Sequence, residues 1–563
     1  MLYRLMLLLA LAGAQRPKII VDATDIRGTI PATLYGSCIE DVNHEIYGGL
    51  YGQLLYGESF EEPGKDVSGA WDPINGQCLV DTTTAFTGRQ SQAMTGPAGI
   101  ANRGLNRWGI AVIKGKIYKG YVYLKGDGPV TIRLEDGRTT YGSATITDLT
   151  PSWKRYEFAI TARATNPKAR LAIYLKRGRV WIDQACLMTP DRFKGLPLRR
   201  DIAEKMQQEG LRFLRYGGSM VNAPDYRWKN MTGPSDKRPP YNGHWYPYSS
   251  NGFGITEFVR FCRAAGFEPA FAINDEDDPD DIASMVDSLR QYDIHYIEIG
   301  NEEVIWGDIA KDYDHYAERF NLLSDAIHRK NPNIKIICAA WWRPASPNME
   351  RVFHAIDGKA AYWDLHTDAD DPKAGEKVDK DLTDMQRLFR EWNPKTTLKC
   401  VIFEENGGHH DLARALGHAT TLNAVRRHGD FVLTSCAANA LQPLGQNDNG
   451  WDQGQIFFTP SHVWGMPPFY AQQMASANHE PLLVADSTDS GMDVTATRSR
   501  DGRTLVIHVV NTSTTPVTAA IDIQHFRAGK TTVTTLQGDT PIYSRGLPRV
   551  FPGRSYTIIR LEE

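Results

Sequence analysis

At 563 residues the chain is longer than one hydrophobic core usually organises, so we expect roughly two to four domains. Its formal net charge of -4 excludes the basic surface that binding to nucleic acid or to an anionic membrane would require. Hydrophobic residues make up 41% of the chain, which is typical of a globular protein.

The N-terminus has the layout of a secretory signal. Arg4 precedes a short apolar run from Leu5 to Ala12, and small residues follow before Gln15. A run of this length is too short to span a bilayer as a permanent helix. We therefore expect a signal peptide at 1–14, cleavage after Ala14 and a mature protein that is secreted or periplasmic, with no membrane span.

Two strands are predicted next. "PKIIVDATD" (17–25) alternates in hydrophobicity and is assigned to the C-terminal domain. "TLYGSCIED" (33–41) is more apolar and ends on a carboxylate, Glu40. It is typical of a strand buried in a parallel sheet.

The hydrophobicity pattern of residues 62–190 differs from that of the segments on either side. Stretches such as "KIYKGYVYLKG" and "WKRYEFAI" alternate with a period of two. This pattern predicts an antiparallel β-sandwich. Because parallel-type strands both precede and follow it, we expect the sandwich to be inserted after the first strand of the next domain.

From Asp191 to about Ser476, short apolar strands alternate with amphipathic helices. The predicted strands are 213–218, 268–273, 295–300, 334–340, 362–366, 398–403 and 431–438. Together with 33–41 they make eight, the number that closes a (β/α)8 TIM barrel. The predicted barrel domain therefore comprises 27–61 and 191–476.

The last block, 477–563, again alternates and is predicted to form a second β-sandwich together with 15–26. Seven cysteines are scattered over apolar strands and helices, and no two have the C-x-x-C spacing. They are interpreted as small core residues. We expect no metal and no cofactor, and the sequence does not specify an oligomeric state.

Carboxylates follow three of the predicted barrel strands: Glu40, Glu302 with Glu303, and Glu404 with Glu405. The carboxyl ends of barrel strands build active sites, so these positions indicate catalysis. Two carboxylates that face one small volume suit glycoside hydrolysis, in which one acid donates a proton and the other attacks or activates water. The expected partner is therefore an oligo- or polysaccharide.

Several stretches carry a specific resemblance. They are "LYGSCIEDVNHEIYGGLYGQLLYGESFE", "GLRFLRYGGSMVNAPDYRWKNMTGP", "YIEIGNEE", "LARALGHATTLNAVRRHGDFVLTSCAANALQPL" and "TPSHVW". In this order they resemble glycoside hydrolase family 51, the α-L-arabinofuranosidases. The inserted block resembles a carbohydrate-binding module of the jelly-roll kind, most clearly in "LTPSWKRYEFAI" and "VWIDQACLM".

The resemblance implies roles for individual residues. Glu302 matches the general acid/base, and Glu405 matches the nucleophile, with Glu404 as second choice. Only one of the adjacent pair can face inward, because successive strand residues point to opposite sides. We expect Glu405 to face Glu302 at about 5 Å, the retaining geometry, and Glu303 and Glu404 to turn away. Substrate-binding roles are implied for Glu40, Asn301, His366, Gln442, Ser219 and Trp228.

The leading hypothesis is thus an exported retaining enzyme that releases arabinofuranosyl units from plant-type glycans. A second hypothesis keeps the mechanism but changes the substrate to another furanoside or to an internally cleaved β-glucan, because Ser219 and Asn406 depart from the family pattern. A third is a catalytically inactive glycan-binding protein that uses the aromatic loop 238–254 as its platform.

Overall fold

The computed structural model describes residues 17–445 and 449–563, so the predicted signal peptide lies outside the described residues. By its internal contacts the chain divides into two compact units. One joins the chain up to Ile30 to Asn478–Glu563, and the other is Pro31–Ala477. The barrel and the inserted sandwich therefore belong to one unit.

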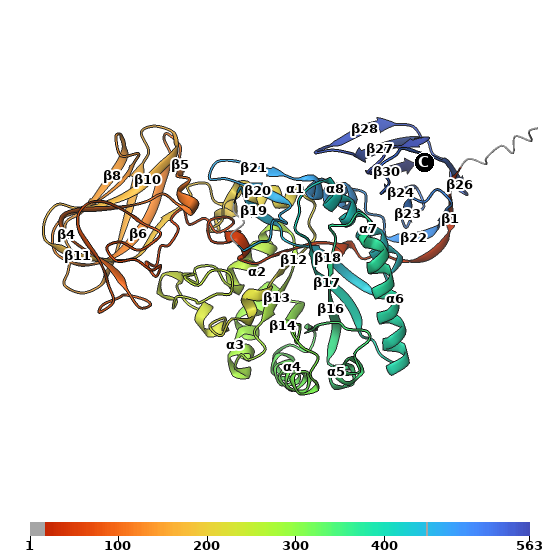
Figure 1. Ribbon diagram of the computed structural model, residues 1–563, viewed down its shortest axis with the longest axis horizontal. Coiled ribbons are helices and arrows are strands. Elements are labelled where there is room, and N and C mark those ends of the chain that lie inside the picture. The colour runs from red at the N-terminus through yellow and green to blue at the C-terminus, as the bar shows by residue number, and fades with distance from the viewer. Residues whose placement is uncertain (1–16, 446–448) are drawn as a thin grey trace, which may run out of the picture. The chain divides into compact units, whose positions relative to one another are not determined.

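Eight parallel strands close into a barrel, as the sequence predicts (Figure 1). Around the barrel the order is β12, β13, β14, β15, β16, β17, β18 and β2. Their bounds are β2 Tyr35–Ile39, β12 Phe213–Tyr216, β13 Glu268–Ile273, β14 Tyr296–Glu303, β15 Lys335–Ala340, β16 Ala360–Asp368, β17 Lys399–Asn406 and β18 Val432–Ala437. Strand β2 pairs with both β12 and β18, which confirms it as the first barrel strand.

Helices surround the barrel strands (Figure 1). They are α1 Arg200–Gln208, α2 Ile255–Ala265, α3 Pro279–Leu289, α4 Ala310–Lys330, α5 Asn348–Ile356, α6 Ala374–Trp392, α7 Leu412–Arg427 and α8 Pro467–Ala477. Helix α2 buries Ile255, Phe258, Val259 and Cys262, one apolar stripe, and ends where Gly266 adopts a left-handed conformation with φ of 86°. Three short strands, β19 Leu441–Pro443, β20 Ile456–Phe458 and β21 Val463–Gly465, follow the last barrel strand.

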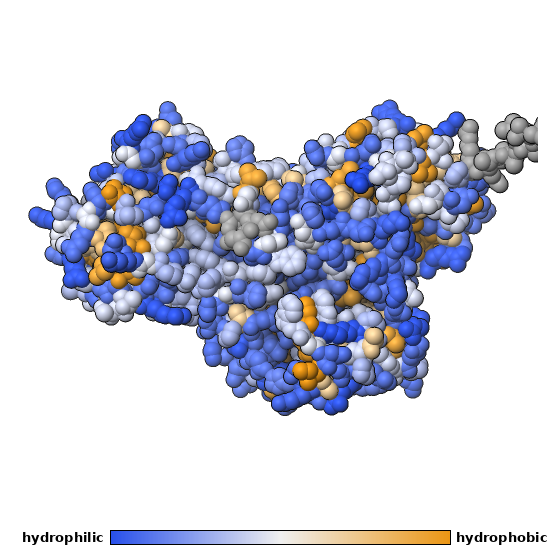
Figure 2. All heavy atoms as spheres, in the orientation of Figure 1, coloured by the Kyte–Doolittle hydropathy of each residue, from blue (hydrophilic) through white to orange (hydrophobic). Residues whose placement is uncertain are grey.

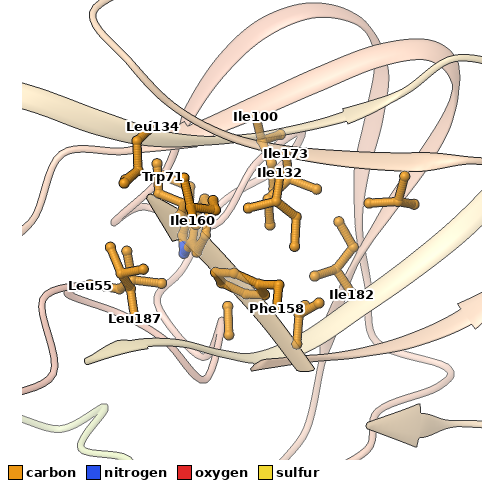
Figure 3. Packing of buried hydrophobic residues seen from close by; sticks show 14 of the residues in the cluster. Leu55, Trp71, Ile100, Ile132, Leu134, Phe158, Ile160, Ile173, Ile182 and Leu187 are labelled. Carbon is orange, nitrogen blue, oxygen red and sulfur yellow. The ribbon is translucent and has the colours of Figure 1, made fainter. Parts of the chain in front are cut away.

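The inserted sandwich is built from nine strands. They are β3 Asp72–Asp81, β4 Ser91–Asn102, β5 Ile110–Val112, β6 Ile117–Gly126, β7 Val130–Glu135, β8 Thr140–Ile146, β9 Lys154–Thr161, β10 Asn166–Leu175 and β11 Arg179–Met188. The two ends of the strand order, β8 and β9, contact each other, so the sheet folds back on itself. Figure 3 shows the core it encloses, in which Trp71, Ile132, Phe158 and Ile173 converge.

The second sandwich has the strand order β26, β1, β22, β23, β24, β30, β27 and β28, with a short pair of β25 and β29. The bounds are β1 Lys18–Thr29, β22 Leu482–Thr488, β23 Asp493–Arg498, β24 Thr504–Asn511, β25 Val517–Thr518, β26 Ala520–Gln524, β27 Lys530–Leu536, β28 Pro541–Arg545, β29 Val550–Phe551 and β30 Ser555–Glu562. The N-terminal strand β1 lies in this sheet and continues to Thr29, past the predicted boundary at residue 26.

The surface and the cysteines agree with a globular chain. The face drawn in Figure 2 is mostly hydrophilic, with small scattered apolar spots. All seven cysteines are free, and all except Cys78 are buried. In the described part of the chain, no helix combines the length and apolarity that crossing a membrane requires.

Candidate active site

A cavity of about 990 Å³ lies at the carboxyl ends of the barrel strands. The predicted site residues that line it are Glu40, Ser219, Asn301, Glu302, His366 and Glu404. They come from five segments of the chain, and barrel closure alone brings them together. The sequence analysis predicted the active site at this end of the barrel.

Glu302 and Glu404 form the carboxylate pair. Glu302 lies near the end of β14 with φ of 50°, at a position where the pairing of β14 with β15 becomes irregular. One ligand atom each of Glu302, His366 and Glu404 lie within 4.8 Å of one another. The two carboxyl groups, from β14 and β17, therefore face one small volume at the mouth of the barrel.

The expectation that Glu405 is the inward residue is wrong. Glu405 is fully buried behind the barrel wall, where its carboxylate is 2.7 Å from His418 Nδ1 and accepts from Ser435 Oγ at 3.0 Å. Glu404 faces the cavity instead. The second choice of nucleophile is thus the residue with access to a substrate.

A shift in the strand register explains why Glu404, rather than Glu405, faces the cavity. Val401 and Phe403 belong to the hydrophobic cluster of the barrel, so strict alternation would turn Glu405 inward. The register of β17 against β18 shifts between Ile402 and Glu405, and its register against β16 shifts as well. The extra residue moves the inward position from Glu405 to Glu404.

Arg215 on β12 holds Glu404 in place. This fully buried guanidinium donates to Glu404 Oε1 at 2.7 Å, to Asn301 Oδ1 at 2.8 Å and to Glu298 Oε2 at 2.9 Å. Burial opposes ionisation of Glu404, but the positive charges of His366 and Arg215 outweigh it and lower the pKa of this carboxyl. Glu404 is therefore held as a carboxylate.

His366 on β16 links the two acids. Its Nδ1 lies 2.8 Å from Glu302 Oε1 and 3.5 Å from Glu404 Oε2, and its Nε2 lies 2.7 Å from Asp364 Oδ2. Burial opposes charging, but the carboxylates of Asp364 and Glu404 raise the pKa of His366 well above its usual value. The imidazole then donates from both nitrogens.

The same three side chains have the spacing of a metal site. A metal ligand must offer a lone pair, and an imidazole that is protonated on both nitrogens has none to offer. The donor set of Glu302, His366 and Glu404 therefore fits proton handling better than metal binding.

Glu40 and Glu303 lie at the cavity wall as acids with raised pKa values. Burial and the charge of Glu404 raise the pKa of Glu40, which accepts from the backbone N–H of Ser219 at 3.1 Å. Glu303 does not turn away from the cavity as expected. Burial and the charge of Asp275 raise its pKa to about 8, so it adds no third negative charge at neutral pH.

Two predicted residues do not reach the cavity. Gln442 on β19 is buried, and its Oε1 accepts from Asn43 Nδ2 at 3.2 Å. Trp228 is buried as well, and its backbone N–H donates to Asp277 at 2.9 Å. Both pack inside the protein and do not line the cavity, so their predicted role in substrate binding is not supported by the geometry.

Three residues of the site went unrecognised in the sequence. Arg215 and Asp364 are charged residues inside apolar strands, in "FLRYGG" and "YWDLH", and that mismatch is the signal that could have identified them. Trp245, from the aromatic loop 238–254, lines the cavity, and its indole N–H donates to Glu40. The loop thus forms part of the wall of the site.

Comparison with known proteins identifies the family. A model of the α-L-arabinofuranosidase 1 domain matches residues 205–291 and 283–387, and a model of the α-L-arabinofuranosidase C-terminal domain matches 391–543. Together these matches take in more than half of the chain. The chain belongs to the α-L-arabinofuranosidases of glycoside hydrolase family 51. It is therefore a glycosidase that acts on arabinofuranosides.

Individual relatives agree with this family 51 assignment. Alpha-L-arabinofuranosidase 1 of Arabidopsis thaliana is 26% identical over 83% of this chain and 75% of its own length. A probable α-L-arabinofuranosidase A of Aspergillus terreus is 22% identical over 91% of this chain and 88% of its own. Among solved structures, an arabinose-bound family 51 α-L-arabinofuranosidase superimposes with a TM-score of 0.80 at 19% identity, covering 97% of this chain and all of that one.

The charge on His366 provides a test of the site. Asp364→Asn removes the carboxylate beside Nε2, so the pKa of the imidazole should fall; nitrogen NMR titration of histidine-labelled protein measures it. In the wild type, stabilisation by charged His366 is complete below about pH 6.5 and is lost as pH rises through the raised folded-state pKa. Asp314→Asn, a surface control, should leave the His366 titration unchanged. An imidazole already neutral at pH 6.5 in the wild type would contradict this electrostatic account.

Proposed function

We propose that the chain is a retaining α-L-arabinofuranosidase with Glu404 as nucleophile and Glu302 as general acid/base. The observation that carries the proposal is the pair of carboxyl groups from β14 and β17 within 4.8 Å at the barrel mouth. Retaining glycosidases place their carboxyl groups about 5–5.5 Å apart, whereas inverting enzymes leave room for a water.

The electrostatics support these two roles. Glu404, paired with Arg215 and His366, is an ionised nucleophile that can attack the anomeric carbon. Glu302 accepts from His366 through Oε1, so its other oxygen is available to carry the proton for the departing glycosidic oxygen. In the second step Glu302 takes a proton from water, which then attacks the covalent glycosyl-enzyme.

The remaining wall of the cavity suits a single furanose ring. Asn301, whose Oδ1 is held by Arg215, can present its amide N–H to a sugar hydroxyl next to the reacting carbon. Glu40, with a raised pKa, can both donate to and accept from another hydroxyl. We propose that the enzyme removes non-reducing arabinofuranosyl units from plant-type glycans. Both carboxylates are present, and Arg215 and His366 hold them in place, which argues against the hypothesis of a catalytically inactive glycan-binding protein.

A panel of 4-nitrophenyl glycosides tests the substrate. The wild type should release nitrophenol from the α-L-arabinofuranoside and show far lower kcat/KM on the β-D-glucopyranoside and β-D-xylopyranoside, because each ring needs its own hydroxyl partners. Turnover of a pyranoside with none of the arabinofuranoside would overturn the choice of sugar but keep the glycosidase mechanism.

Azide rescue assigns the two carboxylates. Glu404→Ala should lose nearly all activity, and azide should restore it by entering the vacated space, giving an arabinosyl azide of inverted configuration. Glu302→Ala should retain activity on substrates with activated leaving groups and give an azide of retained configuration. Glu405→Gln is the matched control beside the nucleophile. If Glu405→Ala, rather than Glu404→Ala, gave the inverted azide, the nucleophile would move to Glu405.

We also propose that the protein is exported. The N-terminal residues 1–14 have the layout of a signal peptide. A relative from Streptomyces chartreusis, 23% identical over 84% of this chain and 63% of its own length, is named an extracellular exo-α-L-arabinofuranosidase. N-terminal sequencing of the protein recovered outside the producing cells should begin at Gln15. Recovery only from inside the cells, with Met1 intact, would contradict export.

A further inference from the structure

A second cavity, of about 510 Å³, lies between the inserted sandwich and the segment that leads into α1. The sandwich contributes the loop before β5, the strand itself and Ile113. The barrel side contributes residues 189–191 and 199–201 together with Glu204. This groove shares no lining residue with the active-site cavity, and the catalytic mechanism does not use it.

One wall of the groove presents an aromatic ring. Trp108 is half-buried at the groove, and Ile113 beside it is 44% exposed. Within the described part of the chain, no aromatic ring or cation stacks on the Trp108 indole. The other half-buried indoles of the sandwich differ, because Lys125 lies 6.0 Å above Trp153 and 5.2 Å above Trp181. The Trp108 face is therefore available to a ligand.

The loop that carries Trp108 holds it in an unusual backbone conformation. Asn106 and Arg107 have φ values of 52° and 54°, in the left-handed region that side chains rarely adopt. Ion pairs fix the loop, since Asp72 accepts from Arg103 Nε at 2.8 Å and from Arg107 Nε at 3.0 Å. Such conformations persist where the surroundings impose them and are frequent at ligand clamps. The indole is thus positioned before any ligand arrives.

The opposite wall is polar, and the charges that line the whole groove balance. An ion pair joins the two sides, because Lys116 of the sandwich lies 2.8 Å from Asp191. On the barrel side, Arg199 lies 2.6 Å from Asp201, and Arg200 lies 3.9 Å from Asp191. The charged lining residues are Lys116, Arg199, Arg200, Asp191, Asp201 and Glu204. Cations and anions are equal in number, so the groove does not favour phosphate, a uronate or a nucleic acid.

We propose that this groove is a second glycan-binding site, which takes a neutral oligosaccharide segment. A sugar ring has an apolar C–H face, which stacks on an indole, and hydroxyls that both donate and accept hydrogen bonds. An exposed aromatic ring in a groove lined by balanced charges matches both properties. The proposal rests on the proposed function, because the ligand class is that of the substrate glycan, and it assigns the groove to holding the polymer.

Affinity electrophoresis through gels containing soluble arabinoxylan or arabinan tests the groove. All variants carry Glu404→Ala, so that the glycan is not cleaved and the active-site cavity contributes equally to every lane. Adding Trp108→Ala should weaken retention about five- to ten-fold, which is the loss expected for one stacked ring. Trp153→Ala is the matched control, because Lys125 already covers that ring. Retention of Trp108→Ala equal to that of its parent on both glycans would overturn the proposal.

Kinetics in the active enzyme give the second readout. Trp108→Ala should leave kcat/KM on 4-nitrophenyl α-L-arabinofuranoside unchanged, which also shows that the variant folds, and should raise KM on the polymer with kcat unchanged. If Trp108→Ala does not fold, Glu204→Gln at the exposed opposite wall gives the same comparison. If the wild type binds the gel glycan and Trp108→Ala weakens that binding, but the wild type does not hydrolyse the aryl arabinofuranoside, the proposed activity is refuted and the proposed glycan site is supported. If the wild type hydrolyses the aryl arabinofuranoside but Trp108→Ala does not change retention, the proposed activity is supported and the proposed glycan site is refuted.

Discussion

The active site depends on one buried cation. Arg215 has no exposed surface, and each of its three guanidinium nitrogens donates to a residue of the site: Glu404, Asn301 and Glu298. Removing a charge from water costs several kcal/mol unless partners compensate it, so this arginine requires carboxylates at its own depth in the barrel. The same contacts that satisfy Arg215 fix the carboxylate of Glu404 and orient the amide of Asn301 beside Glu302. The contacts that stabilise the folded barrel therefore also preorganise the site.

The long insertion does not disturb the barrel because it leaves and returns at nearly one point. Gly52 donates its backbone N–H to Pro197 at 2.8 Å, and an antiparallel bridge joins Gln53 to Met188. Strand β2 can thus pair with β12 across the whole inserted domain, as continuous chain would. Chain ends that lie close together are the condition under which a domain tolerates insertion. The insertion also gives the barrel its groove beside α1, a surface that a bare barrel would lack.

Local patterns in the sequence were sufficient to predict the barrel and the end of it at which carboxylates gather, since strand spacing fixes barrel closure and closure fixes which loops meet. They failed where the pattern is interrupted. The inward position of β17 depends on a register shift between Ile402 and Glu405, and nothing in "VIFEENGG" marks the extra residue. Gln442 and Trp228 were assigned by resemblance, but their orientation is decided by tertiary packing of loops, which no periodicity encodes.

The charges around the cavity explain how neighbouring acids can keep different roles. Arg215 and His366 supply two positive charges, and the carboxyls whose pKa values are lowered are Glu404 and Asp364. The pKa values of Glu298, Glu40 and Glu303 are all raised, with burial the largest cause, so these acids favour the neutral form. Two cations thus balance two carboxylates before any substrate binds.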